Sequence, residues 1–291
     1  MPELPEVETI VRGLRAAVVG RRILGVRFGK TDFVAEPAVI AERLPGSRIA
    51  SVERYGKFIF LVLEPAASEG ARCYFFIHLG MTGQIIPRTS GSPIAPHTHV
   101  FFELDDGREL RYTDIRRFGQ MMLVPESAME AFRTKLGPDP LEITETDFLA
   151  LFRARTARVK ALLLDQSVLR GMGNIYADES LWRARLHPAR IAANLKSAQL
   201  VALHRAVRKV LEDAIRLRGS SISDFLDAEG QPGEYQLHHR VYDHAGKPCP
   251  RCKTTIRRIV VAGRGSYFCP RCQAPPRKTS RPPHKRRSAP K

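Results

Sequence analysis

The stretch Gly137-Pro138-Asp139-Pro140 divides the 291-residue chain into two parts whose apolar residues repeat with different periods. Glycine and proline at this density interrupt helices and strands alike, so the stretch marks a break between structural units. Before the break the apolar runs are short, as in strands. After it, apolar residues recur every three to four positions, as in helices. The sequence therefore predicts a strand-rich unit over residues 1–135 and a helical unit that begins at residue 136.

The part before the break is predicted to form one helix followed by strands. A helix is expected over residues 6–18, where five apolar residues share one face: Val7, Ile10, Val11, Leu14 and Val18. Strands are expected at 23–28, 58–63 and 74–78, and a hairpin at 100–104 and 109–112 around the turn pair Asp106-Gly107. Several short strands separated by turn residues favour a β-sandwich or a β-barrel.

The part after the break is predicted to be helical. Apolar residues recur at helical spacing in four stretches, which are 145–152, 158–165, 174–185 and 197–217. Residues 219–233 are rich in Ser, Gly and Asp and predict a mobile loop. No apolar run reaches the roughly 18 residues of a membrane-spanning helix, so no membrane partner is expected. The acidic opening MPELPEVE is unlike a secretory or transit peptide, which predicts a cytoplasmic protein.

Positive charge is concentrated toward the end of the chain. The whole sequence has 47 Lys+Arg against 30 Asp+Glu, a formal net charge of +17. Residues 1–150 hold 18 basic and 20 acidic residues, whereas residues 241–291 hold 14 basic residues and one acidic residue. This asymmetry indicates a polyanionic partner, such as the phosphate backbone of a nucleic acid. A solvated basic surface without a partner is the alternative.

Four of the five cysteines have the spacing of a zinc site. Two Cys-x-x-Cys pairs are separated by 16 residues and consist of Cys249, Cys252, Cys269 and Cys272. Each pair can place two sulfurs on one tetrahedral metal ion, and four thiolates leave no open position for substrate. One structural Zn²⁺ is therefore predicted. Two disulfides are the alternative, which a reducing cytoplasm disfavours.

Four further motifs, together with the Cys-x-x-Cys pairs, carry a resemblance to a known family. They are Met1-Pro2-Glu3-Leu4-Pro5-Glu6-Val7-Glu8-Thr9, His78-Leu79-Gly80-Met81-Thr82-Gly83, Asp114-Ile115-Arg116-Arg117-Phe118-Gly119, Gly171-Met172-Gly173-Asn174-Ile175-Tyr176-Ala177 and the terminal Cys-x-x-Cys pairs. In this order, over residues 1–273, the chain resembles formamidopyrimidine-DNA glycosylase. The opening and the segment 78–83 favour this family over the related endonuclease VIII type, whose opening usually reads PEGPE.

The resemblance implies an α+β fold with four regions. Residues 1–135 would form an N-terminal β-sandwich catalytic domain with a leading helix. Residues 136–240 would form a helix-two-turn-helix DNA-binding domain with a lesion-covering loop. Residues 241–275 would form a four-cysteine zinc-finger hairpin, and the basic tail 276–291 is expected to be disordered. The implied partner is double-stranded DNA that contains oxidised purines or abasic sites, bound by a monomer.

The resemblance also implies a bifunctional glycosylase and AP lyase of base excision repair. Such an enzyme removes 8-oxoguanine and formamidopyrimidines, then cuts the strand by β,δ-elimination. The family uses the amine of its N-terminal proline, which here is Pro2, to attack the sugar C1′. A small second residue permits removal of Met1, and an α-amino group is partly unprotonated near neutral pH. Sequence alone would make Pro2 a helix-start residue.

Three further catalytic residues are implied by the same motifs. Glu3 matches the proton donor for the opening sugar ring, although an acidic residue near a helix N-terminus is also favoured by the helix dipole. Lys57 matches a lysine that contacts phosphate near the lesion and assists elimination. Arg264 matches the arginine that the zinc-finger hairpin presents to the phosphates.

Seven residues match positions that contact DNA in the family. Met81, Arg116 and Phe118 would occupy the space left when the damaged nucleotide turns out of the duplex, as an enzyme acting at C1′ requires. For Met81 and Phe118, core packing is the alternative. The other four would contact the DNA backbone and are His97, Arg155, Lys160 and Asn174.

The chain departs from the common family pattern at a few positions. Glu234 and His239 occupy positions that are usually aromatic or apolar, and the loop 220–225 has Ser where Thr is common. These changes bear on lesion preference. Two other functions remain open at this stage. One is an endonuclease VIII-like glycosylase for oxidised pyrimidines, and the other is a non-catalytic zinc-ribbon DNA-binding protein on the same scaffold.

Overall fold

The strands of the first half form two antiparallel sheets. In the computed structural model, which describes residues 1–65 and 71–276, the strand orders are β1-β6-β7-β5 and β2-β3-β4-β8. The first sheet contains β1 (Ile23–Phe28), β5 (Gln84–Thr89), β6 (Thr98–Leu104) and β7 (Arg108–Thr113). The second contains β2 (Arg48–Tyr55), β3 (Phe58–Glu64), β4 (Cys73–His78) and β8 (Gln120–Pro125). All the predicted strands are present. Apart from Pro276, the predicted basic tail lies outside the described residues.

The hydrophobic core of the first half lies between the two sheets. Ile59, Leu61 and Leu63 of β3 are buried there, and the rings of Phe75 and Phe102 face each other from opposite sheets with centroids 5.2 Å apart. Of the two predicted alternatives, the β-sandwich is therefore confirmed.

The outer face of the second sheet is also covered. Phe60 and Val62 alternate with the core residues of β3 and belong to a separate apolar cluster, in which the ring of Phe132 lies 5.4 Å from that of Phe60. Phe132 belongs to the helix α3 (Glu126–Arg133). Because both faces of β3 are buried, its sequence is a continuous apolar run and does not alternate with polar residues.

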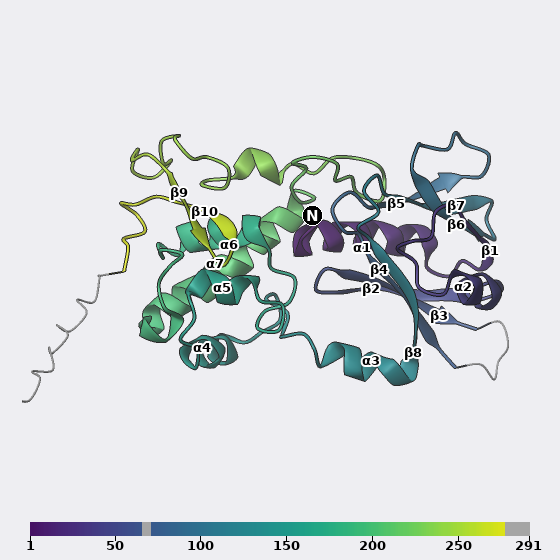
Figure 1. Cartoon of the computed structure of the whole chain (residues 1–291), viewed down its shortest axis with the longest axis horizontal. Helices are drawn as coiled ribbons and strands as arrows, with labels where there is room; N and C mark the ends of the chain where they lie inside the picture. Colours follow the sequence, from purple (N-terminus) through teal and green to yellow (C-terminus); the bar gives the residue numbers. More distant parts are fainter. Residues whose placement is uncertain (66–70, 277–291) are drawn as a thin grey trace, which may run out of the picture.

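The first helix, α1 (Leu4–Val18), joins the two halves of the molecule. The apolar face predicted from the sequence packs into the sandwich core. Leu4 instead belongs to the core of the helical half, and its N–H donates to the carbonyl of Gly171 at 3.0 Å. Figure 1 shows the N-terminus in the middle of the molecule, between the strand-rich and the helix-rich halves.

The second half contains the four predicted helices, each within two residues of its expected ends. They are α4 (Glu145–Arg153), α5 (Val159–Leu164), α6 (Asn174–Arg183) and α7 (Ser197–Arg216), with short 3₁₀ turns at Ala192–Asn194 and Tyr235–His238. The long helix α7 packs on α1, α4 and α6. Residues 219–234 form neither helix nor strand, as expected for a loop.

A two-stranded hairpin follows the helical half. It consists of β9 (Arg257–Val261) and β10 (Arg264–Phe268), which are antiparallel and joined at Ala262-Gly263. Both joining residues have positive φ angles, 51° and 70°, as tight hairpin turns often require. The hairpin packs against α6, beside the helices in Figure 1.

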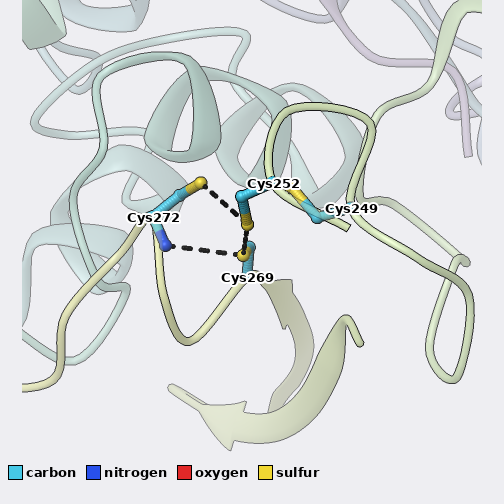
Figure 2. A group of neighbouring side chains, drawn as sticks. All are labelled: Cys249, Cys252, Cys269 and Cys272. Atoms are coloured by element: carbon cyan, nitrogen blue, oxygen red, sulfur yellow. Dashed lines mark hydrogen bonds between the residues drawn. The ribbon is translucent and has the colours of Figure 1, made fainter. Parts of the chain in front are cut away.

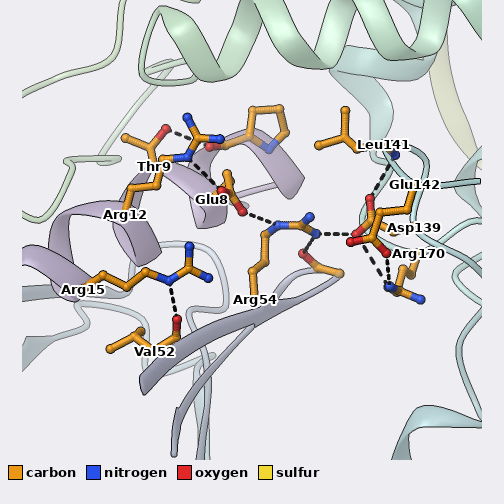
Figure 3. Close-up of polar contacts among 12 residues, drawn as sticks. Glu8, Thr9, Arg12, Arg15, Val52, Arg54, Asp139, Leu141, Glu142 and Arg170 are labelled. Carbon is orange, nitrogen blue, oxygen red and sulfur yellow. Dashed lines mark hydrogen bonds and ion pairs between the residues drawn. The ribbon is translucent and has the colours of Figure 1, made fainter. Parts of the chain in front are cut away.

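A network of buried ion pairs connects the sandwich to the helical half (Figure 3). Arg54 of β2 donates from Nε to Glu8 of α1 at 2.7 Å, and its Nη1 lies 2.8 Å from a carboxylate oxygen of Asp139. The Nε of Arg170 lies 3.6 Å from the same oxygen of Asp139. The aspartate within the sequence break therefore ties the two halves together.

Two short helices were not predicted. The helix α2 (Pro37–Arg43) buries only Ile40, and α3 buries only Met129. A helix with a single buried residue has no apolar repeat from which its period could be recognised. Among the described residues, no helix combines the length and apolar character needed to cross a membrane.

Candidate active site and DNA interface

A cavity of about 390 Å³ lies where the two halves meet. Its walls include predicted site residues from all three parts of the chain, namely Pro2, Glu3, Lys57, Met81, Asn174 and Arg264. The fold therefore brings together groups that are far apart in the sequence and that were expected to share one site.

The first two residues lie at this cavity. Pro2 is buried, whereas Met1 is 52% exposed. With Met1 attached, the nitrogen of Pro2 is part of an amide and has no free electron pair for attack. Removal of Met1 converts the same atom into a secondary amine on a residue that lines the cavity.

The carboxylate of Glu3 is held by the N-terminus of α6. It accepts hydrogen bonds from the backbone N–H groups of Ile175 at 3.2 Å and Tyr176 at 3.5 Å. This approach requires a glycine at position 173, because a Cβ there would collide with the carboxylate of Glu3. The free N–H groups of a helix N-terminus favour negative charge, so α6 orients the carboxylate and stabilises its ionised form.

The charges of Glu3 and Lys57 are set mainly by burial. Burial raises the pKa of Glu3, while the charge of Lys57 and the hydrogen bonds from α6 act in the opposite direction. Burial likewise lowers the pKa of Lys57, against the attraction of Glu3 and Glu6. Both groups are therefore closer to exchanging a proton near neutral pH than an exposed carboxyl or ammonium group would be.

Glu6 is a second buried carboxyl group in the cavity, and the sequence prediction gave it no role. It accepts hydrogen bonds from the N–H groups of Glu3 at 2.8 Å and Ser220 at 2.7 Å, and from the hydroxyl of Tyr176. Burial, followed by the nearby charge of Glu3, raises the pKa of Glu6 to about 7. A sequence signal was present, because Glu6 precedes Ile10 by four residues and so lies beside the apolar face of the helix.

Lys160 does not reach the surface, so the prediction of a direct phosphate contact is corrected. Its side chain is fully buried, with Nζ 2.7 Å from Asp178 and donating to the carbonyl of Gly265 at 2.9 Å. The other carboxylate oxygen of Asp178 accepts from the N–H of Tyr267 at 2.9 Å. A lysine in a basic chain is expected at the surface, and only the tertiary structure supplies its buried acidic partner.

This buried pair positions the hairpin. Gly265 and Tyr267 belong to β10, so the hydrogen bonds to Lys160 and Asp178 hold this strand against α5 and α6. Arg264, the first residue of β10, lines the cavity with an exposed side chain. Lys160 therefore acts on the site through the position of Arg264.

Three predicted DNA-contacting residues lie at the tips of two neighbouring loops. Met81 is 41% exposed and Phe118 is 54% exposed, which excludes the alternative of core packing for both side chains. The guanidinium of Arg116 lies 4.5 Å from the ring centroid of Phe118. Exposed apolar side chains beside an arginine suit insertion into a base stack.

Asp114 fastens these two loops together. Its buried carboxylate accepts hydrogen bonds from the hydroxyls of Thr82 at 2.5 Å and Tyr112 at 3.1 Å, and from the N–H of Gly119 at 2.9 Å. Gly80 has a φ of 61°, and a Cβ at this position would meet the backbone of Phe118. The close packing therefore depends on both Asp114 and Gly80.

Of the remaining predicted contacts, Asn174 lines the cavity, whereas His97 and Arg155 are not among its lining residues. His97 is exposed, has a left-handed φ of 63°, and its carbonyl accepts from the N–H of Asp114 at 3.0 Å. Arg155 follows α4 and donates to the carbonyl of Leu151 at 2.8 Å. Asn174, the first residue of α6, has a buried Oδ1 without a hydrogen-bond partner in the described structure.

The four paired cysteines converge as predicted (Figure 2). All four sulfur atoms lie within 4.8 Å of one another, and Sγ of Cys252 is 3.4 Å from Sγ of Cys269 and 3.5 Å from Sγ of Cys272. Zn–S bonds of about 2.3 Å in a tetrahedron place sulfurs roughly 3.8 Å apart. The cysteines are not joined as disulfides. The donor set and spacing therefore fit one structural Zn²⁺.

Comparisons with known proteins agree with this geometry. Family models for the formamidopyrimidine-DNA glycosylase N-terminal domain, its H2TH domain, and the zinc finger found in FPG and IleRS match residues 1–121, 136–226 and 246–275. The formamidopyrimidine-DNA glycosylase of Solibacter usitatus is 45% identical over 94% of this chain and 99% of the relative. The chain belongs to the formamidopyrimidine-DNA glycosylase family. The resemblance inferred from the motifs is thereby confirmed.

Other members of the formamidopyrimidine-DNA glycosylase family match over the same length. The relative from Pelotomaculum thermopropionicum is 43% identical over 94% of this chain and 99% of its own. The solved complex of Lactococcus lactis Fpg with DNA containing an abasic site has a TM-score of 0.85 at 33% identity, covering 94% of this chain and 100% of that one. A MutM complex with DNA containing carbocyclic 8-oxo-G has a TM-score of 0.84 at 34% identity, with the same coverage.

Proposed function

We propose that this member of the formamidopyrimidine-DNA glycosylase family is a bifunctional DNA glycosylase and AP lyase of base excision repair. It removes oxidised purines, namely 8-oxoguanine and formamidopyrimidines, from double-stranded DNA. The observation that carries the proposal is the single cavity in which Pro2 lies with Glu3, Lys57 and Arg264. A non-catalytic DNA-binding protein has no need for buried acidic and basic groups around its N-terminus.

The chemistry begins at the nitrogen of Pro2 after removal of Met1. The amine attacks C1′ of the damaged nucleotide, the glycosidic bond breaks, and the base leaves with a proton. Glu3 protonates the ring oxygen as the sugar opens, which yields a Schiff base between Pro2 and C1′. Loss of a proton from C2′ then expels the 3′ phosphate, and a second elimination expels the 5′ phosphate. Water finally hydrolyses the Schiff base and frees Pro2.

The neighbouring cations bind the phosphate groups that leave. Lys57 and Arg264 both line the cavity, Lys57 from the turn between β2 and β3 and Arg264 from the hairpin. A cation beside a leaving phosphate stabilises the negative charge that it acquires. Arg264 is assigned to phosphate binding and not to proton donation, because a guanidinium group hardly deprotonates. His97, Arg155 and Asn174 extend this contact along the DNA backbone.

The damaged nucleotide enters the cavity by leaving the duplex. Turning a base out of the stack costs a few kcal/mol, and side chains that fill the vacated space offset this cost. Phe118 would wedge between base pairs, Met81 would fill the vacancy, and Arg116 would hydrogen-bond the unpaired base on the opposite strand. Asp114 keeps all three at fixed positions for this purpose.

The substrate class rests on family membership. Solved structures of relatives include a mutant of Lactococcus lactis Fpg with DNA that contains Fapy-dG and MutM with DNA that contains carbocyclic 8-oxo-G. One Lactococcus lactis Fpg complex holds DNA with an oxidised pyrimidine, so oxidised pyrimidines belong in any test of preference. We expect faster excision of 8-oxoguanine opposite cytosine than of an oxidised pyrimidine. The reverse order would assign the chain to the endonuclease VIII-like alternative.

Borohydride trapping on DNA containing 8-oxoguanine tests the proposal directly. The reduced adduct should map to Pro2 by peptide mass spectrometry. The matched control is the same protein with a removable N-terminal extension, in which the nitrogen of Pro2 is an amide. It should give no adduct until a protease exposes Pro2. An equal adduct yield before and after cleavage would contradict Pro2 as the nucleophile.

Cellular location and assembly follow from the proposed activity. The substrate is genomic DNA, so we infer a cytoplasmic bacterial protein that associates with the nucleoid through DNA. It would act as a monomer, because one chain supplies every group of the cavity described above.

A further inference from the structure

A buried histidine beside the cavity has no part in the mechanism above. His239 is 8% exposed, and its Nε2 lies 3.1 Å from the hydroxyl of Ser220. The hydroxyl of Ser220 lies 3.4 Å from that of Tyr176, which donates its proton to Glu6. A continuous line of hydrogen-bonding groups therefore runs from His239 to the carboxylate of Glu6 in the cavity.

The backbone that carries His239 is firmly anchored. The buried carboxylate of Glu179 accepts hydrogen bonds from three successive N–H groups, those of Arg240, Val241 and Tyr242, each at 2.9 Å. The rings of Tyr235 and Tyr242 pack against the imidazole, with centroids 5.6 and 5.5 Å away. The imidazole is therefore a fixed point next to Ser220.

Ser220 is the first residue of a segment that borders the cavity. Ser220, Ile222, Ser223 and Phe225 all line it, and Ile222 is 54% exposed. The N–H of Ser220 donates to Glu6 at 2.7 Å, while that of Ser221 donates to the side chain of Gln236 at 3.0 Å. Both ends of the segment are thus fastened, because the carbonyl of Asp224 also accepts from Nε2 of Gln84 at 2.6 Å, and the exposed Ile222 lies between them at the cavity.

One tautomer of His239 aligns all the hydrogen bonds of this line in the same direction. Burial lowers the pKa of His239 to about 4, so its imidazole is neutral at physiological pH. The hydroxyl proton of Tyr176 is donated to Glu6, which leaves its oxygen as an acceptor for Ser220. In the tautomer that carries its proton on Nε2, His239 donates to Ser220, and the chain of donors then ends at the carboxyl group of Glu6. Bonds aligned in this way strengthen one another.

We propose that His239 is a positioning residue for recognition of the damaged base. By fixing the hydroxyl of Ser220, it fixes where the segment 220–225 leaves the helical half and how it meets a base in the cavity. This inference rests on the proposed function, because it requires a damaged base to occupy the cavity.

The substitution His239→Leu tests the proposal, since leucine fills the site but cannot bond to Ser220. Single-turnover release of 8-oxoguanine from duplex DNA should slow by about tenfold, the effect of losing one buried hydrogen bond. Cleavage of the same duplex with an abasic site should change by less than about twofold, because no base has to be held. His239→Gln places an amide nitrogen near the position of Nε2 and should restore most of the rate. His238→Leu, the same change at the exposed neighbour, should behave as wild type.

Two results would overturn the inference. One is an equal loss on both DNAs, which would give His239 a purely structural role. The other is an unchanged rate of His239→Leu on both DNAs. If His239→Leu does not fold, Ser220→Ala removes the same hydrogen bond and should show the same selective loss on 8-oxoguanine, whereas His239→Gln should keep most of the rate. Wild-type protein that releases no 8-oxoguanine and forms no borohydride adduct would instead overturn the proposed function.

Discussion

Lys160 and Asp178 form a salt bridge in which both side chains are fully buried, with Nζ 2.7 Å from Oδ1. The pair also hydrogen-bonds the backbone of the hairpin through Gly265 and Tyr267. The residue that places Arg264 at the cavity is therefore a lysine on the preceding helix α5, which the sequence had suggested as a DNA contact. The substitutions below test this and four other relationships in the structure.

Replacing Lys160 with Met should lower the free energy of unfolding by about 3–5 kcal/mol, because it leaves the carboxylate of Asp178 buried without its partner. The loss should be smaller at pH 6 than at pH 8, since burial raises the pKa of Asp178 to about 7 and a protonated Asp178 needs no counter-charge. Denaturant unfolding measures both. Lys209→Met breaks an exposed pair with Asp213 and should cost less than about 1 kcal/mol. If Lys160→Met and Lys209→Met lower the free energy of unfolding equally, burial does not strengthen the pair of Lys160 and Asp178.

Asp114→Asn should loosen the two loops that carry Met81 and Phe118. An amide replaces one acceptor with a donor, which would face N–H and O–H groups that now donate to Asp114. We expect a loss of about 2–3 kcal/mol in stability and weaker binding to damaged duplex DNA, measured by fluorescence anisotropy. Tyr112→Phe removes a single donor and should cost about 1 kcal/mol. If Asp114→Asn binds damaged DNA as tightly as wild type, Asp114 is not needed to hold the two loops in place for DNA binding.

The buried carboxyl of Glu6 should make stability depend on pH. Its pKa is about 7 in the folded protein and near 4.5 when exposed, so the folded state binds more protons between these values. Stability contributed by the protonated form is present below about pH 4.5 and is lost as pH rises through about 7. Relative to Glu6→Gln, wild type should therefore lose up to about 3 kcal/mol between pH 5 and pH 8. If the free energy of unfolding changes with pH by the same amount in both proteins across this range, the pKa of Glu6 is not raised in the folded state.

Arg54→Met should destabilise the junction between the halves by about 3–5 kcal/mol, because Glu8 and Asp139 both lose a buried partner. Differential scanning calorimetry should then resolve two transitions where wild type shows one, since the halves become less coupled. Arg12→Ala removes an exposed partner of the same Glu8 and should cost less than about 0.5 kcal/mol. A single unchanged transition in Arg54→Met would show that the network does not couple the halves.

Cys269→Ser should release the one predicted zinc ion and disorder the hairpin that carries Arg264. Structural zinc sites supply much of the folding energy of such small units, so DNA affinity should fall by at least about 100-fold. Zinc content is measured by atomic emission, and affinity by anisotropy at constant salt. Cys73→Ser, outside the cluster, should keep one zinc per chain and normal binding. Full affinity in zinc-free Cys269→Ser would contradict the structural role.

Most of the helices and strands could be predicted from local patterns, because burying one face of an element requires apolar residues at a regular spacing along its own sequence. The helix at α1 and the four helices after the break follow from apolar spacing alone, to within two residues. The four cysteines could likewise be recognised from spacing, because a tetrahedral metal needs paired ligands from tight turns. The short helices α2 and α3 carry one buried residue each and left no such pattern.

The site was only partly predictable. Pro2, Glu3, Lys57 and Arg264 were named from motifs, and the fold places all four at one cavity. Ser220 and His239 could not be assigned, because each looks like an ordinary polar residue until its partners are known. Glu6 had a signal in its position beside the apolar face of the first helix, which the sequence prediction did not use. Lys160 was predicted to contact DNA at the surface, because its buried partner Asp178 is known only from the tertiary structure.

The sequence by itself determined the order of the elements, the zinc ligands and the family, because each depends on residue types at short or motif-defined spacing. The tertiary structure alone decided which charges are buried and which partners they find across the junction of the two halves. Burial and long-range pairing set the protonation of Glu3, Glu6 and Lys57. These depend on distances between segments that lie far apart along the chain.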